Sequence, residues 1–161
     1  MKNIIKYTLL FCFVTIPLIA SDLNGDDHFN LGMKYLNGDR EVEKDYKKAM
    51  ERFLLAAKEN HPVAQFNLGH MYARGYGVKQ DYKEAKKWYL LAAEQNHPEA
   101  QCSLGQMYHD GRGVPQDLNE AHKWFLSCYN FGTSVVKNIA KKKINDRFEK
   151  EKKRYDRYFE N

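Results

Sequence analysis

The sequence predicts an all-α protein, a right-handed α/α superhelix of three helix pairs followed by a long C-terminal capping helix. The first observation is a repeat: "LGHMYARGYGVKQD" from residue 68 recurs as "LGQMYHDGRGVPQD" from residue 104, and a third copy lies upstream. The second is that each copy holds two apolar runs at helical spacing. The third is a basic, non-repeating stretch after residue 131. A fixed period of this length is typical of solenoids, in which each repeat buries its apolar face on its neighbours.

The copies cover about residues 26–62, 63–98 and 99–131, within a domain of residues 21–130. In the second copy the first helix carries Leu68 and ends at the glycine loop around Gly75. The second helix begins at Asp81, whose carboxylate can accept hydrogen bonds from free amides of the first turn. Glu84 stands three residues later, so we expect a capping box here and again at Asp117 and Glu120.

Glycine also recurs inside the first helix of each copy, at Gly32, Gly69 and Gly105. A glycine in a helix interior costs about 1 kcal/mol relative to alanine. We therefore expect a compensating close approach, with an aromatic residue of the second helix, such as Trp88, pressed onto the bare backbone. The other recurring structural positions are Tyr35, Tyr72, Tyr108, Gly75, Gly111, Gly77, Gly113, Asp81, Asp117, Trp88 and Trp124.

These positions resemble the Sel1-like repeat, with the pattern A-x-x-x-L-G-x-x-Y-x-x-G-x-G-V-x-x-D-x-x-x-A-x-x-W-Y. The second and third copies match almost every position. The first copy is weaker, because it has an inserted loop residue and lacks the second loop glycine. The resemblance covers about residues 26–130 and implies an α/α solenoid that acts as an adaptor. The tetratricopeptide pattern fits less well, since it has a shorter period and no G-x-G-V loop.

The N-terminal residues 1–20 have the layout of a secretory signal peptide. Lys2 and Lys6 precede an apolar run of about 14 residues, which ends at Ala20. A transmembrane span needs roughly 20 residues, so an uncleaved anchor is the second interpretation. We expect a periplasmic or secreted protein. Removal of this segment takes the net charge from +5 to +3. Residues 21–135 then hold 14 basic and 16 acidic residues, and residues 136–161 hold 10 basic and 5 acidic residues. A near-neutral body on an exported chain argues against nucleic-acid binding.

Export leaves two cysteines, Cys102 and Cys128, as a candidate disulfide. They lie near the start of one helix and the end of the next, which an antiparallel pair brings together. The resemblance to cysteine-rich relatives implies bridging cysteines at the positions of Gln101 and Tyr129, so both cysteines are displaced by one residue. Two small buried residues without a bridge are the other interpretation.

The final segment, residues 133–161, predicts a basic amphipathic helix. Its apolar stripe holds Val136, Ile139, Ala140, Ile144, Phe148 and Tyr155. We expect the part from residue 135 to 148 to cover the open end of the last repeat. The lysine-rich face is either solvated or in weak contact with anionic surfaces.

No motif for a cofactor or a metal occurs in the sequence, and we expect neither. His61 and His97 occupy the same repeat position, which places them one repeat apart and predicts helix-start residues rather than shared metal ligands. None of the serines outside residues 1–20 lies in a G-x-S-x-G or S-x-x-K motif.

Two classes of function remain. The first is a non-enzymatic scaffold that binds another protein or a peptide on its concave surface, in an adaptor, host-interaction or immunity-type role. The first helices should line that surface, where residues differ between copies while the core repeats; these are Phe66, Asn67, His70, Arg74, Ser103, Gln106, His109 and Asp110. The alternative is a β-lactamase or penicillin-binding hydrolase, which the resemblance to cysteine-rich relatives implies but which lacks a nucleophile with an evident base.

Overall fold

The computed structural model describes residues 23–159, with side chains for 23–146 and 149–150. Within residues 23–159 it contains seven helices and no strand: α1 (Gly25–Asn37), α2 (Tyr46–Lys58), α3 (Pro62–Arg74), α4 (Tyr82–Glu94), α5 (Pro98–Asp110), α6 (Leu118–Phe131) and α7 (Ser134–Phe159). None of these helices combines the length and the apolar content needed to span a bilayer. The expected signal peptide, residues 1–20, and the side chains of Phe148 and Tyr155 lie outside the described residues.

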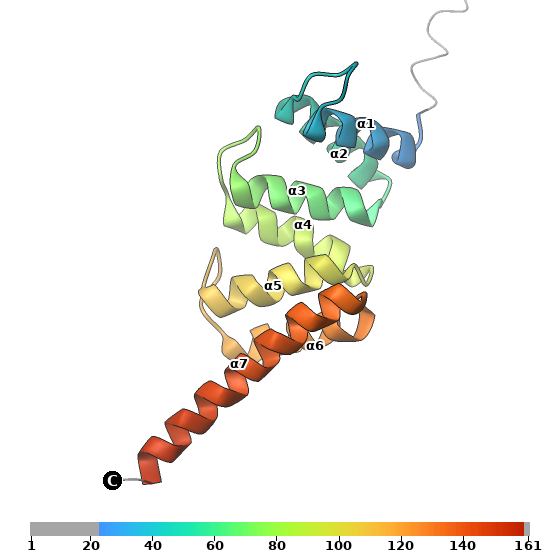
Figure 1. Cartoon of the computed structure of the whole chain (residues 1–161). Helices are drawn as coiled ribbons and strands as arrows, with labels where there is room; N and C mark the ends of the chain where they lie inside the picture. Colours follow the sequence, from blue (N-terminus) through green and yellow to red (C-terminus); the bar gives the residue numbers. More distant parts are fainter. Residues whose placement is uncertain (1–22, 160–161) are drawn as a thin grey trace, which may run out of the picture.

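The helices form three antiparallel pairs, α1–α2, α3–α4 and α5–α6, stacked one after another (Figure 1). The second helix of each pair also packs against the first helix of the next. Helix α7 packs on α6 and then projects away from the stack (Figure 1). The prediction of an all-α repeat superhelix is thus confirmed.

The second helix of each pair starts at an aspartate N-cap. The carboxylate of Asp81 accepts hydrogen bonds from the backbone N–H groups of Lys83 and Glu84, at 2.8 and 3.1 Å. The expected capping box is absent there, because the side chain of Glu84 pairs with Lys87 one turn on. The backbone N–H of Asp81 does not need Glu84, since it donates to the carbonyl of Tyr72 at 2.9 Å. Asp117 repeats this arrangement, with Glu120 paired to Lys123.

The helical glycines allow close packing within each pair, but the aromatic partner differs from the expected one. A Cβ added at Gly69 would lie 2.5 Å from the ring of Tyr89, and one at Gly105 would lie 2.7 Å from the ring of Phe125. Trp88 precedes Tyr89 and points elsewhere, because successive helical residues are about 100° apart. The prediction of close approach is correct, and the choice of Trp88 as the partner is wrong.

The hydrophobic cores lie at the junctions between repeats. The first core joins α2 to α3 around Phe53 and Leu68, and Trp88 of α4 packs against its edge. The second joins α4 to α5 around Tyr89 and Leu104, and Trp124 of α6 packs against it in the same way. Each tryptophan therefore connects its own repeat to the core of the junction before it.

The second loop glycine of the second and third repeats is a contact point with the preceding repeat. Gly77 and Gly113 have positive φ values of 73° and 69°. A Cβ at Gly77 would lie 2.8 Å from the backbone of Tyr46, and one at Gly113 would lie 2.6 Å from Cβ of Tyr82. Residues 23–159 contain no repeat before the first, so this contact has no counterpart there. The first copy, which lacks the second loop glycine, has no such contact within residues 23–159.

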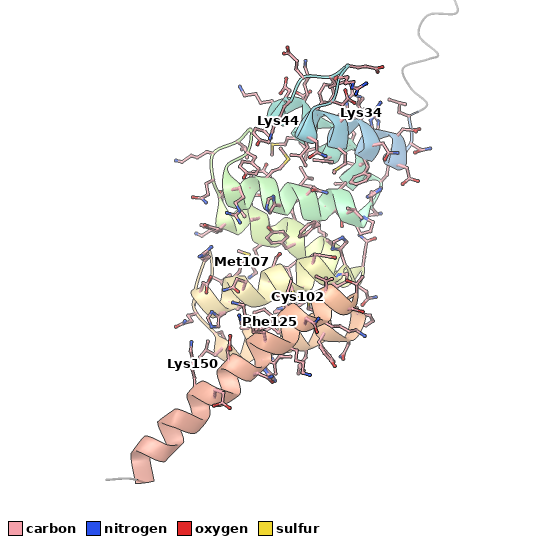
Figure 2. The ribbon with its side chains drawn as sticks, in the orientation of Figure 1. Lys34, Lys44, Cys102, Met107, Phe125 and Lys150 are labelled. Atoms are coloured by element: carbon pink, nitrogen blue, oxygen red, sulfur yellow. A yellow bond between two sulfur atoms is a disulfide. The ribbon has the colours of Figure 1, made fainter. Side chains whose placement is uncertain are left out.

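Helix α7 covers the last repeat with only part of its predicted apolar stripe. Val136 and Ala140 are buried in a third core together with Cys128. Ile139 is 52% exposed, so its assignment to the buried stripe is wrong. It follows Val136 by three residues and therefore lies about 60° from it around α7, beside the buried positions rather than among them. Figure 2 shows Phe125 and Cys102 within the last helix pair and Lys150 out on α7.

Candidate partner-binding groove

An open groove of about 350 Å³ lies between α3 and α5, the first helices of the second and third repeats. Residues from both helices line it, together with the loop and the start of α4 and the loop after α5. The lining residues are His70, Ala73, Arg74, Gln80, Tyr82, Tyr89, Ser103, Gln106, Met107 and Arg112. The groove thus spans two repeats and is mostly polar.

One loop residue in the lining of the groove differs between repeats. Tyr76 lies between the two loop glycines of the second repeat, and its ring stacks on Tyr46 of the first repeat, with centroids 4.8 Å apart. Arg112 holds the equivalent position in the third repeat, next to Tyr82 in the groove lining. A flat ring that fills the space at one junction is therefore replaced by a flexible cation at the next.

Four of the eight predicted surface residues meet in this groove: His70, Arg74, Ser103 and Gln106. Phe66 does not. It packs against the second core and stacks on His97, with ring centroids 5.0 Å apart. It is therefore part of the junction rather than a free surface residue.

The remaining three predicted residues also lie outside the groove lining. Asn67 is half-buried, and its amide donates to the carbonyl of Val63, one turn earlier, at 2.8 Å. The ring of His109 pairs with Asp110 at 2.8 Å. That carboxylate also accepts from Gln106 at 2.7 Å and lies 3.4 Å from Arg112. Asp110 thus contacts two groove residues, Gln106 and Arg112.

The groove favours negative charge in a ligand. Burial lowers the pKa of His70, and the nearby Arg74 guanidinium lowers it further, so His70 is neutral at pH 7. Burial raises the pKa of Tyr89 to about 12, partly offset by Ser103 and Arg74, so this phenol stays protonated. Burial opposes ionisation of Asp110, but hydrogen bonds from His109 and Gln106 and the charge of Arg112 lower its pKa overall. With His70 neutral and Tyr89 protonated, the charged side chains in the groove lining are those of Arg74 and Arg112.

A second hollow of about 340 Å³ lies between α5 and α7. His109 lines it from α5, and Lys143, Asp146, Glu149 and Lys150 line it from α7. Two basic and two acidic side chains of α7 occur there. This part of α7 is therefore mixed in charge rather than a uniform basic strip.

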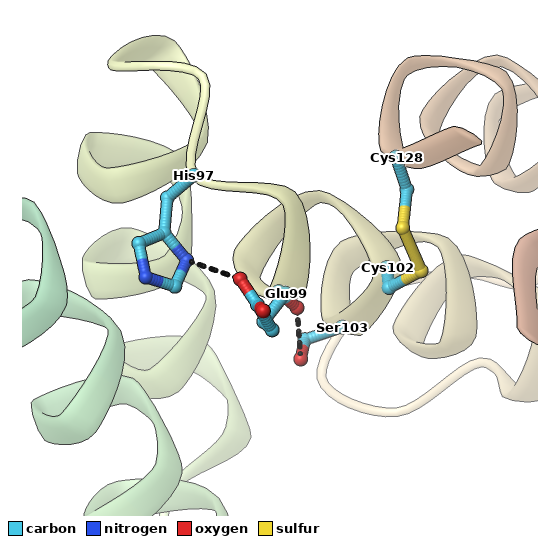
Figure 3. The surroundings of a disulfide bond; sticks show 5 residues. All are labelled: His97, Glu99, Cys102, Ser103 and Cys128. Carbon is cyan, nitrogen blue, oxygen red and sulfur yellow. Dashed lines mark hydrogen bonds and ion pairs between the residues drawn. A yellow bond between two sulfur atoms is a disulfide. The ribbon is translucent and has the colours of Figure 1, made fainter. Parts of the chain in front are cut away.

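A disulfide joins Cys102 of α5 to Cys128 of α6, with Cα atoms 5.3 Å apart (Figure 3). The displacement of both cysteines by one residue in opposite directions still leaves them facing each other across the antiparallel pair. Ser103 of the groove follows Cys102 directly, and its hydroxyl donates to the carbonyl of Glu99 at 2.8 Å (Figure 3). The bridge therefore fixes α5 to α6 beside the groove.

Histidines at the repeat junctions have structural surroundings. His61 caps α3, where its Nδ1 accepts from the backbone N–H of Ala64 at 3.2 Å. Burial lowers the pKa of His97, against the opposing charge of Glu99, whose carboxylate lies 3.4 Å from Nδ1 (Figure 3). The described residues contain no group of three or more side chains placed to hold a metal ion.

Sequence reasoning missed the groove residues outside the first helices, namely Gln80, Tyr82, Tyr89 and Arg112. A comparison of the loops "GYG" and "GRG" could have identified Arg112, because the two glycines are kept between the copies and only the middle residue changes. Gln80 gave no such signal, since polar loop residues are common.

Comparison with known proteins supports the repeat assignment. The family model described as Sel1 repeat matches residues 26–61, 62–97 and 98–127. A comparison with curated protein sequences finds no match.

Solved structures give the same fold. A Sel1 repeat protein from Oxalobacter formigenes is 41% identical, with a TM-score of 0.66 over 70% of this chain and 46% of that one. The protein c5321, a protective antigen of uropathogenic Escherichia coli strains with an SLR fold, is 38% identical, with a TM-score of 0.66 over 70% of this chain and 24% of that one. Helicobacter pylori cysteine rich protein B shares the fold at 21% identity, with a TM-score of 0.57 over 73% of this chain and 98% of that one.

The present chain thus spans less than half the length of the first two proteins. The repeat matches nevertheless cover well over half of its own residues. With three consecutive matches and the same helix-pair stack, this chain belongs to the Sel1 repeat family.

Proposed function

We propose that this chain is an exported scaffold that binds another protein or a peptide in the α3–α5 groove. The observation that carries the proposal is the groove itself, in which two successive repeats contribute polar side chains that the cores do not use. Sel1 repeat proteins generally mediate protein–protein interactions, which supports a binding role. The adaptor, host-interaction or immunity-type role belongs to the proposal.

Export is supported by two features. The basic and apolar pattern of residues 1–20 resembles a signal peptide. The Cys102–Cys128 bridge would persist in an oxidising compartment. We expect Ser21 or a near neighbour as the mature N-terminus, which the intact mass of the exported protein measures. A full-length mass in a membrane fraction would instead indicate an uncleaved anchor.

Site-specific photo-cross-linking tests the groove as the binding surface. A photoreactive residue at Gln106 lies in the groove, and one at Leu91 lies on α4 outside the groove, where Leu91 is 44% exposed. In cells that produce the chain, a partner should be cross-linked from Gln106 and not from Leu91. The purified partner should then bind the wild type and lose affinity for a variant with Ser103→Ala and Gln106→Ala. Equal cross-linking from both positions would contradict the proposal.

The surroundings of Ser103 favour a structural role for this serine over that of a nucleophile. Its hydroxyl hydrogen is used in the bond to the Glu99 carbonyl. The neighbouring phenol of Tyr89, with a pKa of about 12, is a poor general base at neutral pH. Nitrocefin hydrolysis by the purified chain, abolished by Ser103→Ala, would count against a pure scaffold.

A further inference from the structure

We propose that the α3–α5 groove selects a carboxylate on an extended peptide, either an acidic side chain or a free C-terminus. This inference rests on the proposed binding role and adds the chemical class of the ligand. It begins from the two arginines of the groove, Arg74 on α3 and Arg112 in the loop after α5. No acidic side chain lines the groove among the described residues.

The two arginines differ in how far they are neutralised. Arg112 lies 3.4 Å from the carboxylate of Asp110, and its side chain is 57% exposed. Arg74 makes no ion pair with a described residue, although its charge is close enough to lower the pKa of both His70 and Tyr89. Arginine presents a planar set of N–H donors that matches a carboxylate, and an unpaired one at the rim of a groove is suited to bind an anion.

The two glutamines supply acceptors of fixed orientation. The amide nitrogen of Gln80 donates to the carbonyl of Ala73 at 2.7 Å and to the hydroxyl of Tyr82 at 3.1 Å. The amide nitrogen of Gln106 donates to Asp110 at 2.7 Å. Both amide oxygens are left without a partner among the described residues. They can accept hydrogen bonds from backbone N–H groups of a peptide while the arginines bind its carboxylate.

The size and polarity of the groove favour a peptide segment over an enclosed small molecule. Its volume of about 350 Å³ is small, and it is open and lined by polar groups. Small-molecule sites are usually more enclosed and more apolar. At the equivalent junction between the first two repeats, the Tyr46–Tyr76 stack occupies the corresponding place. The arginine of the groove is therefore a feature of the second junction, because the first junction has a tyrosine at that position.

The test is a titration of the isotope-labelled chain, as processed by the producing cells, with four N-acetylated peptides, followed by NMR. The probes are acetyl-Ala-Glu-Ala-amide, its Gln and Lys counterparts, and acetyl-Ala-Ala-Ala with a free C-terminus. We expect the Glu peptide, the free C-terminus or both to shift the signals of Arg74, Ser103 and Arg112. The Gln and Lys peptides should bind at least about tenfold more weakly, since a charged hydrogen bond is lost. The Glu and C-terminal arms distinguish the two sources of the carboxylate.

Variants assign the effect to the groove. Arg74→Gln and Arg112→Gln should each weaken binding of the carboxylate peptides by about tenfold. Lys83→Gln, which removes an exposed cation of α4 outside the groove, should leave binding unchanged. Raising the salt concentration from about 50 mM to about 500 mM should weaken binding in the wild type, because the arginines are exposed.

Two results would overturn this inference. Equal binding of all four peptides would leave the groove as a peptide site but remove its selectivity for a carboxylate, so the proposed function would survive. Failure of both carboxylate peptides to shift any groove signal at millimolar concentration would reject the inference. In that case the cross-linking from Gln106 still decides the proposed function independently.

Discussion

Replacement of Gly69 by alanine tests the close packing within a repeat, because helix propensity and packing change the free energy of unfolding in opposite directions. Alanine is about 1 kcal/mol better than glycine in a helix interior. If helix propensity alone decided the outcome, the variant would be more stable than the wild type. The structure predicts the opposite, since the new Cβ would lie 2.5 Å from Cδ1 and 2.6 Å from Cε1 of Tyr89.

The magnitude follows from this overlap. Two carbon atoms in contact lie about 3.5–4.0 Å apart, so the ring or the helix must move by about 1 Å. Tyr89 is only 4% exposed and sits in the second core, where close packing leaves little free space. Overpacking of a core typically costs about 1–3 kcal/mol. The overlap of about 1 Å with a nearly fully buried ring places this cost in the upper part of the range, about 2–3 kcal/mol. After the gain of about 1 kcal/mol in helix propensity, the net loss should be about 1–2 kcal/mol, or roughly 2–8 °C in melting temperature for a chain of this size.

Urea denaturation followed by circular dichroism measures the difference. The comparison variant is Gly25→Ala, where the added Cβ would lie 3.2 Å from Oε2 and 3.3 Å from Cβ of Glu59, a milder overlap, so the loss of stability should be smaller than at Gly69. In a Tyr89→Leu background the clash is gone, so Gly69→Ala should become neutral or stabilising. A Gly69→Ala single variant at least as stable as the wild type would refute the close-packing argument.

Three further perturbations test other parts of the structure. Reduction of the Cys102–Cys128 bridge should lower stability by about 3 kcal/mol, and a melting temperature unaffected by reductant would contradict the bridge. The lowered pKa of His70 favours its neutral form in the folded state, so its stabilisation is complete above about pH 6.5 and is lost as the pH falls towards the folded pKa. The melting temperature should accordingly depend less on pH between about 7 and 5 in His70→Gln, and an unchanged dependence would exclude this contribution. Val136→Asp should destabilise by about 2–4 kcal/mol in chemical denaturation, whereas Val135→Asp, at a residue 70% exposed, should be nearly neutral; equal effects would show that α7 does not cover the last repeat.

The sequence was sufficient to predict the repeat architecture, because its signals are local and occur more than once. Asn60 and Asn96, at the same position of successive repeats, both adopt a left-handed conformation, with φ of 59° and 61°. The sequence did not predict which aromatic residue of the second helix contacts the helical glycine. Trp88 and Tyr89 are adjacent and both apolar, and only the rotation of α4 decides which one faces Gly69.

The candidate site was predictable only in part. Residues that varied between first helices included His70 and Ser103, which line the groove, but also Phe66, which packs in the junction. Variation alone does not separate these cases, since a junction residue can also change from copy to copy. Contacts between distant residues are also hard to predict from sequence. The amide oxygen of the buried Gln65, for example, accepts a hydrogen bond from the amide nitrogen of Gln95 at 2.8 Å, 30 positions away.

The positions of the two tryptophans mean that their fluorescence can report on the junctions between repeats. The chain contains two tryptophans, Trp88 and Trp124. Trp88 packs against the core between the first and second repeats, and Trp124 against the core between the second and third. Replacing either one by phenylalanine would leave an emission signal from a single junction. The two single-tryptophan proteins would then reveal whether the junctions separate together or one after the other during unfolding.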